Sequence, residues 1–165
     1  MTAEAPRLVE EMARRFQAGD ADGARALMHP AIRVQQPASL PHGGWYEGHD
    51  GLAAMGVAFA RHWDRTITDP RVFGDGGNAV QVTTQTWTAK ATGRSATVDV
   101  VELFAVADGA IVEIRVFQQD TRLLLATLAD AAAGGRGTPG QSTAGQGMTG
   151  QGATGQGTTG GGEHR

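Results

Sequence analysis

Three consecutive segments decide the fold: NAVQVTTQTWTAK (residues 78–90), SATVDVVELFAV (residues 95–106) and AIVEIRVFQ (residues 110–118). Each is rich in valine, threonine, isoleucine or phenylalanine, the residue types that favour strands. Short segments that contain glycine, Thr92-Gly93-Arg94 and Ala107-Asp108-Gly109, join them. Strands joined in this way form hairpins. The sequence therefore predicts an antiparallel sheet in the second half of the chain.

Two helices and a strand are predicted before this sheet. Leu8, Met12 and Phe16 recur at helical spacing with charged residues between them, which indicates an amphipathic first helix. A shorter helix is predicted over residues 21–28. Residues 32–36 then alternate as in a strand, which should end at the following proline because proline lacks a backbone donor.

An aromatic loop and two further helices complete the prediction. Residues 38–48 contain more aromatic side chains than a simple linker would, and loops of this kind often fold over a site. A third helix, capped by Asp50, is predicted to carry the apolar stripe Leu52, Met55, Phe59 and Trp63. A last helix should begin at Asp120 or Thr121 and end in residues 131–133.

The glycine distribution separates a folded domain from a tail. The chain has 165 residues and 25 glycines, and the glycines concentrate after residue 133. We expect one domain in residues 1–133, because this length suits a single hydrophobic core. From residue 145 the chain repeats Gly-Gln-Gly with a period of five, and residues 134–165 contain little apolar surface, so we expect a flexible tail.

Composition excludes several classes of function. There are 14 Lys and Arg against 17 Asp and Glu, and the basic residues are scattered, so nucleic acid is not an expected partner. The chain contains no cysteine, which excludes thiol chemistry and fits a reducing compartment. No apolar run is long enough for a signal peptide or a membrane span. We therefore expect a cytoplasmic protein that does not bind membranes.

Five segments resemble a known superfamily in their order and spacing. They are His29–Pro37, Gly48–Leu52, Val100–Phe104, Asp108–Glu113 and Phe117–Asp120. Together they are similar to nuclear transport factor 2, ketosteroid isomerase and the SnoaL-like polyketide cyclases. The resemblance implies an α+β fold in which a curved mixed or antiparallel sheet wraps around N-terminal helices, a cone-shaped, cystatin-like α+β barrel. It also implies a ligand pocket at the wide end, and no cofactor.

Glu102 is the first candidate for acid–base chemistry. Strand alternation places it on the same face as Val98, Val100, Phe104 and Val106. Removal from water would raise the pKa of its carboxyl group. The resemblance implies a protonated acid at this position in the isomerase, where it donates a hydrogen bond to an oxyanion. Pairing of Glu102 with Arg33 or Arg115 across the sheet is an equally open alternative.

Three further polar residues are candidates for catalysis. Gln36 ends its strand where the resemblance implies the aspartate base of the isomerase, and an amide can orient a carbonyl or water but cannot hold a proton. His42 lies in the aromatic loop and has the side-chain type of a general base. Asp120 is a third candidate, although capping of the last helix explains it more simply.

The predicted pocket is aromatic, and positions that are chemical in relatives are apolar here. We expect Trp45, Tyr46, Phe59, Trp63 and Trp87 to line the cavity. The resemblance places Met12 where the isomerase has its oxyanion-hole tyrosine, and Val116 near the aspartate of the cyclases. The histidines His29, His49 and His62 lack metal-ligand spacing, so no metal is expected.

Two functions follow as hypotheses. The first is a cofactor-independent isomerase, cyclase or dehydratase that transfers protons on an apolar, carbonyl-bearing small metabolite. The second is a non-catalytic ligand-binding or dimerisation domain. The resemblance implies a homodimer formed through the outer sheet face, and the strip expected to point outward is Gln81, Thr83, Gln85 and Trp87.

Overall fold

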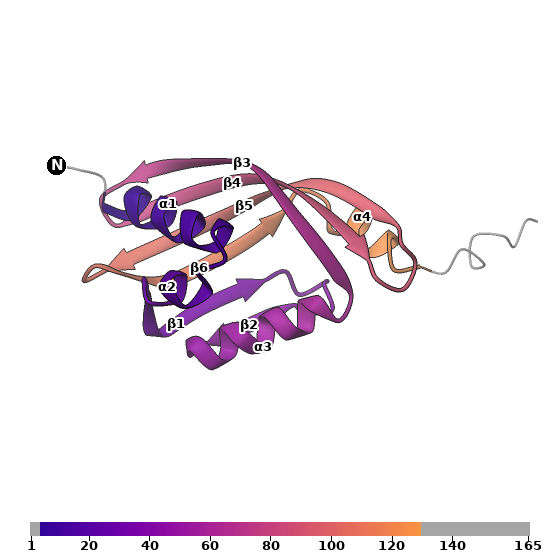
Figure 1. Ribbon diagram of the computed structural model, residues 1–165, viewed down its shortest axis with the longest axis horizontal. Helices are drawn as coiled ribbons and strands as arrows, with labels where there is room; N and C mark the ends of the chain where they lie inside the picture. Colours follow the sequence, from indigo (N-terminus) through magenta and orange to yellow (C-terminus); the bar gives the residue numbers. More distant parts are fainter. Residues whose placement is uncertain (1–3, 130–165) are drawn as a thin grey trace, which may run out of the picture.

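The computed structural model describes residues 4–129, which form four helices and six strands (Figure 1). The helices are α1 (Glu4–Gln17), α2 (Ala21–Arg25), α3 (Gly48–Ala60) and α4 (Thr121–Ala126). The strands are β1 (Met28–Gln36), β2 (Gly44–Glu47), β3 (Trp63–Asp75), β4 (Asn78–Ala89), β5 (Ser95–Ala107) and β6 (Ala110–Gln118). The predicted boundary near residue 133 and the predicted tail lie outside the described residues.

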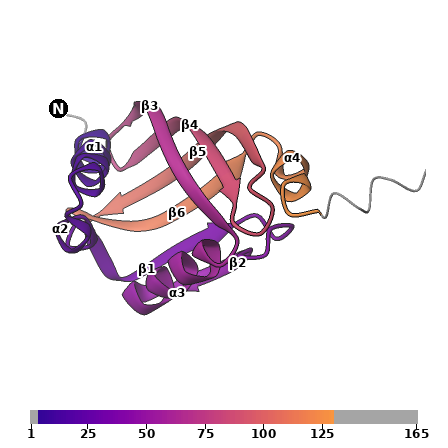
Figure 2. The ribbon, with the colours of Figure 1, turned by 45° about the vertical axis from the view of Figure 1, so that its right-hand side comes forward.

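All six strands join one mixed sheet in the order β2-β1-β6-β5-β4-β3. β1 runs parallel to β6, and every other neighbouring pair is antiparallel. The sheet curves strongly, with α1 and α2 on its concave side and α3 beside β1 and β2 (Figure 2). This is the predicted α+β fold, a curved mixed sheet wrapped around N-terminal helices.

The core fills the concave side of the sheet. Helix α1 contributes buried Val9 and Met12, as its predicted amphipathic stripe requires, although Phe16 at its end is 49% exposed. Strand β1 contributes fully buried Ile32 and Val34. The predicted face of β5 is also confirmed, since Val98, Val100 and Phe104 are buried. The apolar set from α1, β1 and the three long strands forms one continuous core.

Three helix boundaries differ from the prediction. Helix α2 ends at Arg25, and β1 already begins at Met28. Helix α3 ends at Ala60, so Trp63 is the first residue of β3 and not the end of the helical stripe. Helix α4 ends at Ala126, where the side chain of Thr127 accepts a hydrogen bond from Trp63 Nε1 (2.8 Å). Trp63 therefore packs against the end of α4 instead of continuing the apolar stripe of α3.

Two strands were missed from the sequence. β3 is an edge strand in which nearly every residue after Trp63 is exposed, so it shows no apolar alternation. Pairing of its backbone with β4 forms it, with a bulge between Thr68 and Arg71 where Asp69 has a φ of 51°. β2 has only four residues and pairs with β1.

The predicted outward strip on β4 is wrong, because all four of its side chains point into the molecule. Gln81, Thr83, Gln85 and Trp87 are each at most 6% exposed. The register places Gln81 opposite Glu102 and Thr83 opposite Val100, so both strands turn the same face to the interior. The residues of β4 that face outward are the intervening valines and threonines.

Candidate functional site

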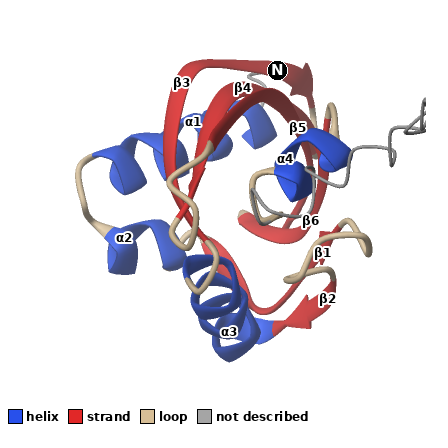
Figure 3. Ribbon diagram, turned by 90° about the vertical axis from the view of Figure 1, so that its right-hand side faces the viewer, coloured by secondary structure: helices blue, strands red, loops and turns tan. Residues whose placement is uncertain are grey.

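Figure 3 shows the curve of the sheet end-on. A small cavity is lined by residues of this curved sheet and of its neighbours. Its volume is about 60 Å³. Its polar lining residues are Gln36, His42, Arg65, Gln85, Glu102 and Gln118. Its other lining residues are Met55, Gly56, Phe59, Trp87, Val100 and Val116. Five strands, helix α3 and the loop before β2 therefore supply the walls.

Glu102 is the acid of this cavity. It lies on β5, where it is half-buried and lines the cavity, and desolvation raises the pKa of its carboxyl group. The predicted partners do not pair with it. Arg33 lies near Glu47 (3.8 Å) and Glu113 (3.7 Å) on the outer face, and Arg115 donates to Gln35 Oε1 (3.0 Å).

Arg65 is the cation of the cavity, and the sequence analysis missed it. Its guanidinium lies 5.0 Å from the centre of the Phe59 ring. Desolvation lowers the pKa of Arg65, and the negative charge of Glu102 opposes this with a smaller effect. For Glu102, burial raises the pKa, and the positive charge of Arg65 opposes this with a smaller effect. The residue stays exposed toward solvent, which places it at the mouth of the cavity.

Arg65 and Glu102 do not form an ion pair in residues 4–129, although each feels the charge of the other. The signal for Arg65 was present in the sequence. Trp63, Arg65 and Ile67 alternate, and alternation from a buried tryptophan turns the arginine inward. Extending the third helix to Trp63 hid this pattern.

His42 is buried in an aromatic cluster and is only 2% exposed. Its ring centre lies 5.3 Å from that of Phe59, 5.9 Å from Trp63 and 5.7 Å from Trp87. Burial lowers the pKa of His42 to about 4, with smaller contributions from the charges of Arg65 and His62. The imidazole is therefore neutral at pH 7 and a weaker base than an ordinary histidine, and its role as a general base stays a prediction.

The Nδ1 atom of His42 is buried and has no hydrogen-bond partner in the part of the chain that the structure describes. The loop that carries the ring is fixed, since Tyr46 Oη donates to the His42 carbonyl oxygen (3.0 Å). Gly43 also packs closely, because a Cβ there would lie 2.4 Å from the Pro37 carbonyl oxygen. The histidine is therefore held in the cavity wall with an unused polar atom.

Amide side chains form the rest of the polar wall. Trp87 Nε1 donates to Gln85 Oε1 (2.9 Å), and Gln85 Nε2 donates to Thr83 Oγ1 (3.0 Å), which fixes the orientation of Gln85. Gln36 Nε2 contacts Met55 Sδ at 3.4 Å, and its Oε1 accepts a long bond from Gln118 Nε2 (3.5 Å). Gln118 Oε1 is buried without a partner among residues 4–129.

The structure brings together six of the predicted site residues. Gln36, His42, Glu102, Phe59, Trp87 and Val116 all line the cavity.

The other five predicted site residues lie outside its lining. Asp120 caps α4, where its Oδ1 accepts from the Leu123 N–H (2.9 Å). Trp45 is 43% exposed beneath the Arg33 guanidinium on the outer face. Tyr46 fixes the loop, and Met12 and Trp63 belong to the core.

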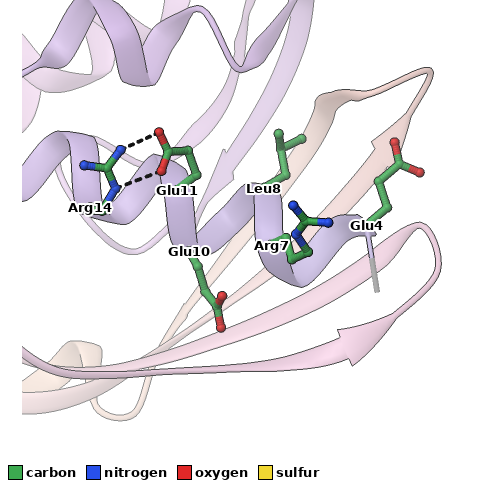
Figure 4. Close-up of a pocket in the computed structure, with 6 residues that line it drawn as sticks. All are labelled: Glu4, Arg7, Leu8, Glu10, Glu11 and Arg14. Carbon is green, nitrogen blue, oxygen red and sulfur yellow. Dashed lines mark hydrogen bonds and ion pairs between the residues drawn. The ribbon is translucent and has the colours of Figure 1, made fainter. Parts of the chain in front are cut away.

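A larger hollow of about 750 Å³ lies along α1. Its lining within residues 4–129 comes from that helix alone, and the labelled side chains point into solvent or toward one another (Figure 4). Arg14 and Glu11 pair there at 2.6 Å. This is a shallow surface groove whose charges largely satisfy each other, and it holds none of the predicted site residues.

The small cavity combines groups that support proton transfer. It holds one carboxyl group with a raised pKa, one cation at the mouth and a neutral imidazole, between aromatic and aliphatic walls. Such a carboxyl group binds its proton more tightly than a solvated one, which suits it to take up and return a proton. No three His, Asp or Glu side chains between residues 4 and 129 are grouped so that they could hold a metal ion.

Comparisons with known proteins agree with this architecture. The family model of the SnoaL-like domain matches residues 9–114. An NTF2-like protein of unknown function from Burkholderia pseudomallei is 25% identical, with a TM-score of 0.69 over 78% of this chain and all of that one. A polyketide cyclase-like protein from Pseudomonas putida is 19% identical, with a TM-score of 0.63 over 76% of this chain and 98% of that one.

A third structure, TerC co-crystallised with polyporic acid, is 20% identical, with a TM-score of 0.67 over 76% of this chain and 98% of that one. The sequence matches no curated protein. Among the helices of the described residues, none is both long and apolar enough to span a membrane.

Proposed function

Because the chain belongs to the SnoaL-like domain family, we propose that it is an enzyme that moves a proton on a small carbonyl compound held in this cavity. The observation that carries the proposal is the placement of Glu102, a carboxyl group that has no partner within residues 4–129, lines the cavity and has its pKa raised by desolvation. The reaction class is isomerisation, cyclisation or dehydration without a cofactor.

The proposed step uses Glu102 and Arg65 in different roles. The ionised Glu102 takes a proton from the carbon next to the carbonyl group, and the electrons of that C–H bond move onto the carbonyl oxygen. Arg65 stabilises the enolate oxygen that forms, because its cation lines the mouth of the cavity that also holds Glu102. Glu102 then returns the proton to a different atom, and the carbonyl bond forms again.

The remaining polar groups orient the substrate. The amides of Gln36 and Gln118 offer hydrogen bonds and cannot hold a proton, and neutral His42 offers a hydrogen bond from a ring whose basicity burial has lowered. Trp87 and Phe59 supply flat apolar walls that exclude water. The metabolite must be small, since the cavity volume of about 60 Å³ is well below the roughly 300–1,000 Å³ of pockets for drug-sized ligands.

The test is hydrogen–deuterium exchange on carbonyl compounds in D₂O, followed by NMR with the full chain. The panel contains acetylacetone, ethyl acetoacetate, butanone and 2-oxobutanoate. We expect Glu102→Gln to slow exchange of the accepted compound by about a hundredfold or more, the usual range for a general base. Asp99→Asn is the matched control, since Asp99 lies on the outer face of the same strand and accepts from Thr84 Oγ1 (2.8 Å).

Equal rates for the chain with Glu102 and for Glu102→Gln would contradict the proposal, as would an equal loss in Asp99→Asn. Absence of exchange with every compound would favour a ligand-binding domain. The observation behind this second function is that apolar Met12 and Val116 occupy positions where, by the resemblance, related enzymes carry catalytic side chains.

We also propose that a second copy of the chain covers the outer face of the sheet. Phe73 on β3, Leu103 on β5 and Phe117 on β6 are 56%, 37% and 45% exposed. Val80 pairs with both Phe73 and Leu103, so an apolar strip crosses neighbouring strands. Sedimentation should give a dimer that Leu103→Glu dissociates; a monomer at all concentrations would refute this.

A further inference from the structure

Arg65 gives the cavity an unused positive charge. Two other arginines of the described sheet have partners: Arg33 lies between two carboxylates, and Arg115 donates to Gln35. Arg71 on β3 is exposed and does not line this cavity, so Arg65 is the arginine whose charge faces the cavity. The Arg65 side chain makes no hydrogen bond or ion pair to another residue in the range 4–129, and its guanidinium lies 5.0 Å from the centre of the Phe59 ring. A guanidinium offers several N–H donors in a plane, a geometry that matches a carboxylate.

Two buried polar atoms beside this charge also lack partners. His42 Nδ1 and Gln118 Oε1 have none among the residues that the structure describes, and both side chains line the cavity. A buried polar atom without a hydrogen bond costs roughly 1–3 kcal/mol. His42 is only 2% exposed, so bulk solvent does not reach its ring easily. A ligand with several polar atoms would satisfy these groups, whereas a hydrocarbon would not.

The dimensions of the cavity limit the ligand to a few non-hydrogen atoms. Its volume of about 60 Å³ leaves no room for a fused ring system. Its aliphatic lining residues Val100, Val116 and Met55 suit a short carbon chain.

These observations fit one class of ligand. We infer that the cavity binds a small oxo acid, whose carboxylate and neighbouring carbonyl oxygen both lie on the Arg65 guanidinium and whose adjacent carbon faces Glu102. This inference rests on the proposed function, because it names the substrate class of the same site. Ionised Glu102 would stand beside the carbon that loses its proton. The carboxylate would also neutralise the positive charge left at the mouth.

The experiment compares three ligands that differ in one group each. They are 2-oxobutanoate, which has both groups, butanoate, which lacks the ketone, and butanone, which lacks the carboxylate. Binding to the full chain is followed by tryptophan fluorescence, because Trp87 lines the cavity. We expect 2-oxobutanoate to bind about tenfold or more tightly than butanone, as is typical when a charged hydrogen bond is lost.

Variants assign the effect to Arg65. We expect Arg65→Gln to weaken 2-oxobutanoate binding about tenfold or more and to leave butanone binding nearly unchanged. Arg71→Gln is the matched control, since Arg71 lies on the same strand, is exposed, and its loss changes the net charge equally. Circular dichroism checks that each variant folds, and the comparison of the three ligands on the unsubstituted chain needs no variant.

The outcomes separate this inference from the proposed function. Glu102→Gln keeps the cation, so it should still bind the oxo acid while losing exchange. The substrate class is wrong if butanone binds as tightly as 2-oxobutanoate, if no carboxylate binds, or if Arg65→Gln and Arg71→Gln behave alike. The proposed function would still stand in these cases if exchange on a neutral ketone depends on Glu102. If the oxo acid binds through Arg65 but never exchanges, the reaction is wrong and the ligand class stands.

Discussion

Replacing His42 with Phe should make the stability of the protein less sensitive to acid. Phenylalanine keeps a ring within the cluster of Phe59, Trp63 and Trp87 but cannot be protonated. Burial lowers the pKa of His42 from 6.5 to about 4 in the folded state. The unfolded chain therefore binds a proton more readily than the folded chain between these two values.

The sign and the size follow from this shift. A lowered pKa in the folded state gives stability that is complete above pH 6.5 and is lost as the pH falls toward about 4. At about 1.4 kcal/mol per pH unit, the loss is at most about 3 kcal/mol, and solvent screening reduces it. The raised pKa of Glu102 acts in the opposite direction, but it is common to both proteins and cancels in their difference.

The assay is urea unfolding of the full chain at pH 7, 6, 5 and 4, followed by tryptophan fluorescence. The free energy of unfolding should fall more steeply with acid for the unsubstituted protein than for His42→Phe. His29→Gln is the matched control, since His29 is exposed, and it should follow the unsubstituted curve. Curves for His42→Phe and the unsubstituted protein that stay parallel from pH 7 to 4 would refute the argument.

Three further predictions concern other contacts. Thr127→Val should lower the free energy of unfolding by roughly 1–3 kcal/mol, because it leaves the buried Trp63 Nε1–H unpaired; an unchanged urea midpoint would contradict this. Asp120→Ala should cost about 1 kcal/mol through loss of the α4 cap and leave carbonyl exchange intact; lost exchange would restore a catalytic role. Arg65→Gln should raise the pKa of Glu102 further, since the cation lowers it, and NMR titration that shows a fall would contradict this.

The central strands and the acid could be predicted because local rules agree there. Strict alternation in β4 to β6 and glycine turns define the hairpins, and the same alternation turns Glu102 inward beside Val100 and Phe104. The face of β4 was assigned wrongly because Gln81 and Gln85 are polar and yet buried. The Gln85 amide is paired and lines the cavity, whereas Gln81 Oε1 is buried without a partner among residues 4–129, and single-strand polarity predicts neither environment.

Apolar periodicity does not reveal the edge strand, and the inward face of Arg65 follows only once Trp63 is known to begin that strand. β3 exposes nearly all of its side chains, so only its backbone pairing with β4 identifies it. Without β3, Arg65 has no assigned face. The environment of His42 was equally hidden, because three aromatic residues from α3, β3 and β4 meet around it. Contacts between distant segments decide both positions.

The most direct test of the account is a titration of Glu102 in the full chain by NMR with a carboxyl ¹³C label. The account predicts a midpoint above the ordinary value of 4.5, because burial outweighs the opposing charge of Arg65. Bound 2-oxobutanoate should raise the midpoint of Glu102 further, because its carboxylate offsets the positive charge of Arg65. A midpoint at or below 4.5 would mean that Glu102 is solvated or ion-paired, and it would contradict the proposed acid–base site.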